Sequence, residues 1–260
     1  MPTFYPSLTP TLTTWALQQP VFFVSSAPLR GKHINMSPKG MADTSLAIMG
    51  PNEAAYVDMT GSGNETIAHV RENGRVTVMF CSFETTPRIL RLFCTGRVVE
   101  AGDGKGAFER VVDRMGLGGK VLVGARAAIV LDIFKVQTSC GFGVPRLALT
   151  VDPDTQEPTP TLATRDTWLK QAEKLDRVGK LGGYRAEWNT QSLDGLPGLE
   201  SARKESGGLR SVWWGRVGNW SRWYRTHIEW VVVVAMVAFH FYAYDVYPVI
   251  LALAFPLLLG

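Results

Sequence analysis

A glycine-rich turn that leads into a short helix is predicted at Thr60–Arg75, with a strand on either side. Ser62 and Glu65 have the S-x-x-E spacing of a capping box, which marks a helix start. Asn73 and Gly74 supply the stop signal. The first turn of a helix carries unpaired N–H groups and a partial positive charge, so it can hold a phosphate group. The plainer alternative is that the box only caps a helix.

Most of residues 1–150 have the pattern of strands joined by turns or brief helices. The segment Pro87–Val99 has a period of two, with Leu90 and Leu92 on one face and Arg91 on the other. A helix is predicted at Gly106–Met115. Several strands without a regular βαβ alternation favour an antiparallel barrel over a doubly wound sheet. The strands are predicted at Pro20–Ser25, His33–Ser37, Ala55–Met59, Arg75–Phe83, Pro87–Val99 and Ala125–Val136.

Three parts are predicted along the chain. Residues 1–150 form the barrel domain, and the Pro- and Thr-rich residues 151–162 are a boundary or a surface excursion. Residues 151–208 supply a helix at Thr164–Val178 and an extended arm, rich in Gly and Asn, that packs on the barrel. Residues 209–260 are apolar and aromatic, and they form the third part.

The third part is predicted to be an interfacial segment and a transmembrane anchor. Ile228–Tyr247 is nearly all apolar and has the roughly 20 residues that a helix needs to cross a bilayer. By the positive-inside rule, the basic residues before it place the barrel domain in the cytosol. A buried core helix is the alternative, and the path of residues 246–260 stays open. The basic residues are Arg203, Lys204, Arg210, Arg216, Arg222 and Arg225.

Composition excludes several classes of site. The cysteines Cys81, Cys94 and Cys140 are far apart and form no CxxC pair or His cluster, so neither a zinc site nor a disulfide framework is predicted. The net charge of +4 is concentrated before the apolar tail, which points away from a nucleic-acid partner. The first residues lack the pattern of a signal peptide, in keeping with a cytosolic main domain.

Five segments occur in the order of a known family. The chain resembles the pyridoxamine 5′-phosphate oxidase-like family over roughly Thr11–Pro197. That resemblance implies a six-stranded antiparallel split β-barrel, usually a homodimer, with FMN in each of two clefts at the interface. The segments are Asn35–Gly40, Tyr56–Thr66, Met79–Phe83, Pro87–Leu92 and Gln137–Pro145.

The resemblance also implies the residues that hold the FMN phosphate. Carried over by position, they are Lys39, Ser62, Asn64, Thr66 and Arg88. True oxidases of the family open this helix with Ser-Arg-Lys, whereas this chain has Asn64-Glu65-Thr66. The C-terminal Arg-x-His substrate segment of those enzymes has no counterpart within Thr11–Pro197, the part of the chain that carries the resemblance. Pyridoxamine phosphate is therefore not expected to be the substrate.

Three functions are compatible with this pattern. The first is an FMN-dependent oxidoreductase of unknown substrate, in which the flavin ring carries the redox chemistry and no catalytic residue is assigned. The second is a binding module that has lost redox function or holds haem or a deazaflavin. The third is a membrane-tethered scaffold whose barrel only dimerises. His33 and His69 are both predicted to lie at the surface rather than in a site.

Overall fold

The computed structural model describes residues 2–102, 104–117 and 123–246. It divides the chain into two compact units, Met1–Leu169 and Lys170–Gly260. The first unit carries an antiparallel sheet with short helices, and the second is helical. The three-part division predicted from the sequence stays a prediction.

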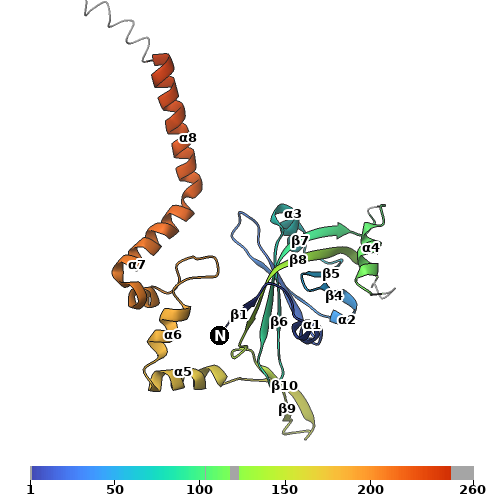
Figure 1. The fold of residues 1–260 in the computed structure, drawn as a ribbon. Helices are drawn as coiled ribbons and strands as arrows, with labels where there is room; N and C mark the ends of the chain where they lie inside the picture. Colours follow the sequence, from blue (N-terminus) through green and yellow to red (C-terminus); the bar gives the residue numbers. More distant parts are fainter. Residues whose placement is uncertain (1, 103, 118–122, 247–260) are drawn as a thin grey trace, which may run out of the picture. The chain divides into compact units, whose positions relative to one another are not determined.

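The first unit contains a curved sheet (Figure 1). Its strand order is β3-β2-β6-β7-β8-β5-β4, with β1 paired to β8. Every one of these described pairs is antiparallel. The outer strands β3 and β4 do not pair with each other among the described residues, so the sheet is not closed. The strands are β1 Thr3–Tyr5, β2 Phe22–Ser26, β3 Asn35–Lys39, β4 Leu46–Gly50, β5 Glu53–Met59, β6 Arg75–Cys81, β7 Ile89–Glu100 and β8 Ala125–Ser139.

This architecture agrees with the predicted class in being mainly antiparallel β with short helices, and it is consistent with a split barrel. The predicted number of six strands is wrong, because the described sheet has eight and β1 and β4 were not predicted. The period of two in β7 is confirmed, because Leu90, Leu92 and Cys94 are buried. The strand predicted at His33–Ser37 is β3, but it continues through Pro38 to Lys39. An edge strand such as β3 tolerates proline, since one of its sides needs no backbone N–H partner.

In the described part of the first unit, four helices accompany the sheet: α1 Pro10–Leu17, α2 Ala42–Ser45, α3 Glu65–Asn73 and α4 Ala107–Arg114. The two that the sequence predicts, α3 and α4, are confirmed within a few residues. Helix α3 packs on β2, β6 and β7, and Ile67 and Val70 are the apolar residues that it buries. It ends at Gly74, whose φ of 71° is the left-handed conformation that glycine adopts without strain.

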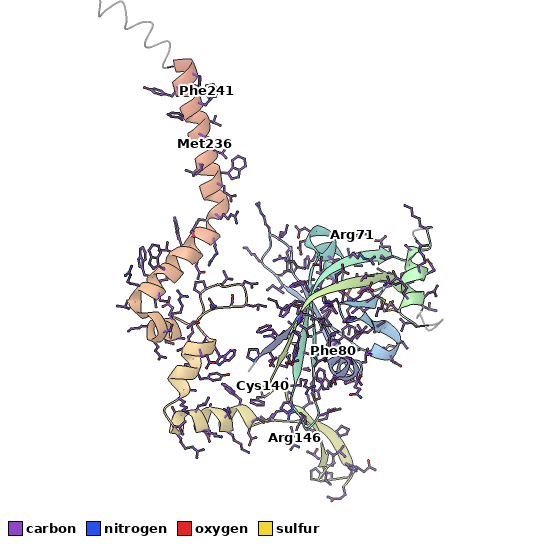
Figure 2. All side chains as sticks on the ribbon, in the orientation of Figure 1. Arg71, Phe80, Cys140, Arg146, Met236 and Phe241 are labelled. Carbon is purple, nitrogen blue, oxygen red and sulfur yellow. The ribbon has the colours of Figure 1, made fainter. Side chains whose placement is uncertain are left out.

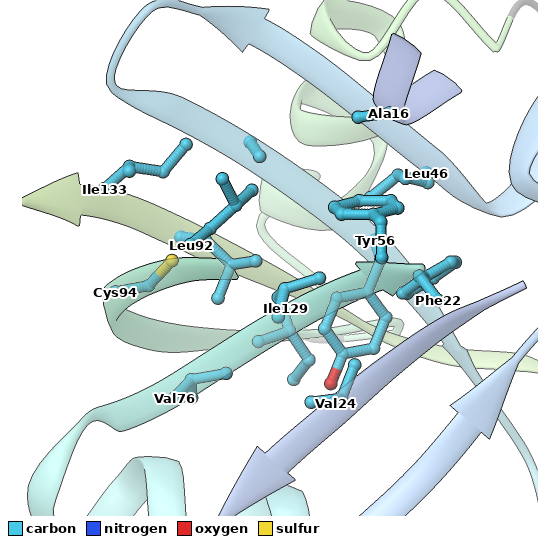
Figure 3. Packing of buried hydrophobic residues seen from close by; sticks show 14 of the residues in the cluster. Ala16, Phe22, Val24, Leu46, Tyr56, Val76, Leu92, Cys94, Ile129 and Ile133 are labelled. Carbon is cyan, nitrogen blue, oxygen red and sulfur yellow. The ribbon is translucent and has the colours of Figure 1, made fainter. Parts of the chain in front are cut away.

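The core lies inside the curved sheet and is built from alternate residues of its strands. Phe22, Phe80 and Leu90 are fully buried, and Phe22 packs against Tyr56 and Phe80 with ring centroids 6.0 Å apart (Figures 2 and 3). Aromatic and aliphatic side chains of this size each contribute about 1.5–3 kcal/mol on burial. The core therefore holds in place the strands that carry the polar residues described below.

Residues 151–162 belong largely to a hairpin whose side chains are mostly exposed, which fits the predicted surface excursion. Arg146–Val151 (β9) and Pro158–Ala163 (β10) form an antiparallel hairpin. The helix predicted at Thr164–Val178 is confirmed as α5, Thr167–Arg177.

The predicted extended arm is wrong in its conformation, because two helices lie in it. Leu181–Trp188 forms α6, and Glu200 begins α7, which runs to Trp223. Helix α7 bends at Gly208, whose φ of 64° and ψ of −170° are not helical. A glycine can adopt this backbone conformation because it has no Cβ.

The predicted membrane anchor is wrong for the described part of the tail. Arg225–Phe241 forms α8, whose first turn contains the ion pair of Arg225 with Glu229 at 2.8 Å. Its 17 residues rise about 26 Å, and a π-helical turn at Tyr242–Val246 follows. No helix among residues 2–102, 104–117 and 123–246 is long and apolar enough to cross a bilayer. The membrane-anchored location that rested on this span is overturned with it, and residues 247–260 lie outside the described residues.

Candidate functional site

A cavity of about 280 Å³ lies at the start of α3, where residues of β3, β5 and β8 meet the glycine-rich turn. Most of the residues around it are polar or charged. Its lining consists of Ser37, Lys39, Asp58, Met59, Gly61, Ser62, Gly63, Glu65, Thr66 and Arg126. The sequence prediction of a ligand-facing corner at Thr60–Arg75 thus coincides with a real hollow.

The Asp58 carboxylate organises the floor of this cavity. Its Oδ1 lies 3.2 Å from Nζ of Lys39, and its Oδ2 accepts a hydrogen bond of 2.7 Å from Nε of Arg126. Asp58 is only 3% exposed, so the two cations offset the cost of burying its charge. The three side chains together carry one net positive charge.

Arg126 also fixes the glycine-rich turn. Its guanidinium donates to the backbone carbonyl of Gly61 at 3.3 Å and to that of Gly63. The planar fork of arginine can bind a carboxylate and carbonyls at the same time, which an ammonium group cannot do with the same geometry. One side chain of β8 thus connects the buried carboxylate of β5 with the turn that precedes α3.

Glu65 takes a different position from the predicted one. Helix α3 begins at Glu65 itself, with Asn64 as its N-cap and no side-chain capping bond. The Glu65 carboxylate accepts a hydrogen bond of 3.0 Å from the backbone N–H of Asn64. The hydrogen bond from its own backbone N–H holds the pKa of this carboxyl below its ordinary value. The predicted capping box with Ser62 is therefore not formed.

Tyr56 lies beside the cavity with its ring fully buried (Figure 3). Nζ of Lys39 stands 5.9 Å from the ring centroid. Thr66 lies close to the hydroxyl, but the pair lacks the geometry of a hydrogen bond and the phenol has no partner among the described residues. Burial, with Asp58 acting in the same direction, raises the pKa of Tyr56 far above its usual range. Tyr56 is therefore a neutral phenol at neutral pH.

A buried polar network joins α3 to β2 and β3. Nδ1 of His69 lies 3.0 Å from the Ser26 hydroxyl, and the Asn35 amide donates to the Thr66 hydroxyl at 2.9 Å. A weaker contact of 3.5 Å links Asn35 to Ser26. The expectation that His69 lies at the surface is wrong, since it is only 6% exposed. His33 is exposed, and its ring lies 5.5 Å from that of His69 at a tilt of 44°. The network fixes the helix start in front of the strands.

The structure brings together three of the five predicted ligand residues. Lys39, Ser62 and Thr66 line the cavity, although the Thr66 hydroxyl is already engaged by Asn35. Asn64 is not among the lining residues, and its backbone N–H donates to the Glu65 carboxylate. Arg88 is not among the lining residues, and its guanidinium lies 5.4 Å from the Trp15 ring centroid.

Asp58 and Arg126 were missed from the sequence. Asp58 is the one charged residue in Ala55–Met59, and Arg126 is the one charged residue in Ala125–Leu131. Both stretches are otherwise apolar. Such isolated charges in buried strands need a partner. The pairing of β5 with β8 supplies it, because Asp58 lies opposite Ala127.

The other hollows and reactive side chains in the described residues offer fewer groups that could bind a ligand or take part in a reaction. A hollow of about 490 Å³ in the second unit is lined by α7 residues including Leu209 and Trp213, and Arg216 pairs there with Glu200 at 2.6 Å. Across the described ranges, no group of three or more His, Cys, Asp or Glu side chains could hold a metal ion. All three cysteines are free, and only Cys140 is exposed.

Solved structures match this chain only at low sequence identity and low TM-score. HupZ of Group A Streptococcus is 18% identical over 50% of this chain and 98% of its own, with a TM-score of 0.37. An FMN-binding protein of Syntrophomonas wolfei is 15% identical over 44% of this chain and 74% of its own, with a TM-score of 0.33. An FAD-binding protein of Mycobacterium smegmatis is 8% identical over 52% of this chain and 97% of its own, at 0.34. Similarity at this level says nothing about ligand or activity.

Sequence relationships are much closer. The Aspergillus flavus protein described as pyridoxamine 5′-phosphate oxidase family protein ustO is 57% identical over 229 residues, which cover 88% of this chain and 90% of that protein. Residues 8–140 match the sequence profile of the family described as pyridoxamine 5′-phosphate oxidase. The match includes β2 to β7, helix α3 and the whole lining of the cavity. This chain therefore belongs to the pyridoxamine 5′-phosphate oxidase family.

Proposed function

We propose that this protein binds a flavin, specifically FMN, with the phosphate group in the cavity at the start of α3, and that it acts as an oxidoreductase. The observation that carries the proposal is that Lys39, Arg126 and the first residues of α3 line one hollow. Membership of the family supports it, since this is the part of the chain that its profile covers.

The residues of the cavity fit a phosphate group. Phosphate is held in proteins by backbone N–H groups at helix starts together with hydroxyl and cationic donors. Ser62 offers an exposed hydroxyl, Asn64 and Glu65 offer backbone N–H groups, and Lys39 offers an ammonium beside them. Lys39, Arg126 and Asp58 together keep one positive charge that is not compensated within the group.

The protein would supply position and electrostatics. When bound, the isoalloxazine ring of a flavin supplies the electron-transfer chemistry. Arg126 holds the turn that faces the phosphate, and the network of His69, Ser26 and Asn35 holds the helix start in place. Tyr56, buried behind Lys39 and Asp58, is a neutral phenol and adds no negative charge near the site.

A second candidate is a binding module without redox function, or one that holds another cofactor such as haem or a deazaflavin. The Glu65 carboxylate favours it, because it places a negative charge at the helix start. Asp58 and Glu65 balance Lys39 and Arg126, so the lining has no net formal charge. A ligand without a phosphate would meet less repulsion there.

A homodimer and a role for Arg88 also stay proposals. Both follow from the family resemblance, and Arg88 would then act from outside this cavity. Light scattering of the full chain would test the dimer. An Arg88→Gln variant that binds FMN as the wild type does would remove that residue from the ligand set.

The experiment that tests the flavin proposal is a titration of the full chain with FMN, followed by the visible spectrum and by quenching of flavin fluorescence. Saturable binding is expected, and Lys39→Met should raise the Kd about 10- to 100-fold, since it removes a charge-assisted hydrogen bond. Lys135→Met is the matched control, because Lys135 lies on β8 and forms no described ion pair or hydrogen bond. A colourless protein that leaves FMN fluorescence unchanged would refute flavin binding and favour the second candidate.

A further inference from the structure

The Glu65 side chain provides a hydrogen-bond acceptor for the free backbone N–H groups at the start of α3. Its carboxylate accepts the backbone N–H of Asn64 at 3.0 Å and is also bonded by its own N–H. These are the donors that an incoming phosphate would use, because the first N–H groups of a helix have no partner within it. A carboxylate and a phosphate present similar anionic oxygens to such donors.

The carboxylate also lies within the wall of the cavity. Glu65 is one of the lining residues, and its Oε2 lies so close to Gly63 that a Cβ at that glycine would be 3.0 Å away. Glycine at this position therefore lets the side chain fold back over the turn. The side chain itself is exposed, so it can also turn outward into water without opening the core.

Charges around the carboxylate favour its present position. His33 and His69 both lower the pKa of Glu65, and Lys39 and Arg126 line the same cavity. Asp58 faces the cavity as well, with its charge already shared between the two cations. Glu65 is thus ionised at neutral pH and is the second negative charge of the lining.

We propose that Glu65 acts as an internal competitor for the ligand's phosphate and thereby sets the preference of this site between phosphorylated and unphosphorylated flavins. The inference rests on the proposed flavin function. A phosphorylated flavin binds only as the carboxylate leaves the N–H groups, whereas riboflavin leaves it in place. Two like charges at contact distance in water weaken binding about fivefold, and more where water is excluded.

The test compares the Kd of FMN and of riboflavin, by fluorescence quenching at one pH and ionic strength, for wild type, Glu65→Gln and Glu65→Ala. Glutamine keeps an acceptor for the backbone N–H but removes the charge. Glu65→Gln is expected to lower the Kd of FMN at least about fivefold and to change that of riboflavin less than twofold, and Glu65→Ala should change the FMN-to-riboflavin ratio in the same direction.

Glu72→Gln is the matched control. Glu72 lies on the same helix, and its carboxylate also accepts a backbone N–H, that of Leu29 at 2.8 Å, but it does not line the cavity. It should leave both Kd values unchanged. Equal changes for the two flavins, or no change in Glu65→Gln, would overturn the role of Glu65 while leaving flavin binding intact. Absence of binding of both flavins to every protein would instead overturn the proposed function, and this inference with it.

Discussion

Nε of Arg126 donates a hydrogen bond of 2.7 Å to Oδ2 of Asp58, and this contact joins β8 to β5 beneath the start of α3. The carboxylate side chain is 4% exposed and the arginine side chain 27% exposed. Removing one partner of a buried ion pair strongly destabilises the folded protein, because the remaining charge is then buried without compensation. This pair therefore connects the stability of the fold with the electrostatics of the candidate site.

Asp58→Asn should destabilise the protein by about 2–4 kcal/mol, because Lys39 and Arg126 then face each other without a carboxylate between them. Glu53→Gln on the same strand is the control, since Glu53 pairs with Arg114 at 2.7 Å near the surface and such pairs contribute about 0–1 kcal/mol. Urea unfolding of the two variants measures the difference. Equal losses would show that burial of the Asp58 pair adds no stability.

The polar network beneath α3 gives a second prediction. Ser26→Ala removes the hydroxyl that lies 3.0 Å from Nδ1 of His69 and leaves a buried ring nitrogen unpaired, at a cost of about 1–3 kcal/mol. Ser25→Ala is the matched control, because Ser25 is next on the strand, points to the other face and makes no described side-chain hydrogen bond. It should change the free energy of unfolding by less than about 0.5 kcal/mol. A Ser26→Ala variant as stable as Ser25→Ala would contradict the network's role.

Part of this fold was predictable from local patterns. The alternation around Leu90 and Leu92 identified β7, and the Asn73-Gly74 stop placed the end of α3. Helical spacing could also have found the burial of His69, since Thr66, His69, Val70 and Asn73 recur at three- and four-residue intervals.

Other features depend on contacts between distant strands. Arg126 meets Asp58 only because of the β5–β8 register, and no local pattern encodes a partner 68 residues away. The position of Glu65 was undecided because the S-x-x-E spacing fits a capping box, whereas the structure starts the helix two residues later than that box requires. The tail was misread because apolar composition alone does not fix where a helix begins and ends.

Burial of Cys94 predicts a loss of stability at alkaline pH. Burial, aided by Asp132, raises the pKa of this thiol from 9.0 to about 12. The unfolded chain releases the proton above pH 9 while the folded protein keeps it, so the contribution to stability is complete below pH 9 and is lost as the pH rises toward 12. The slope is at most about 1.4 kcal/mol per pH unit.

Cys94→Ala separates this effect from packing. The variant should be less stable than wild type at pH 8, because a buried side chain is shortened, but its free energy of unfolding should fall less between pH 9 and 11. Cys140→Ala, which alters the exposed cysteine, should follow the wild-type profile. Urea unfolding at several pH values measures all three, and parallel profiles for wild type and Cys94→Ala would count against the effect.

The most direct test of the proposed site is backbone amide NMR of the isotope-labelled full chain during titration with FMN and, separately, with riboflavin. If the start of α3 holds the phosphate, FMN will shift the amide signals of Gly63, Asn64 and Glu65 by far more than riboflavin does, because only FMN brings new acceptors to these N–H groups. FMN that binds while these three signals move no more than they do with riboflavin would contradict the account and place the phosphate elsewhere.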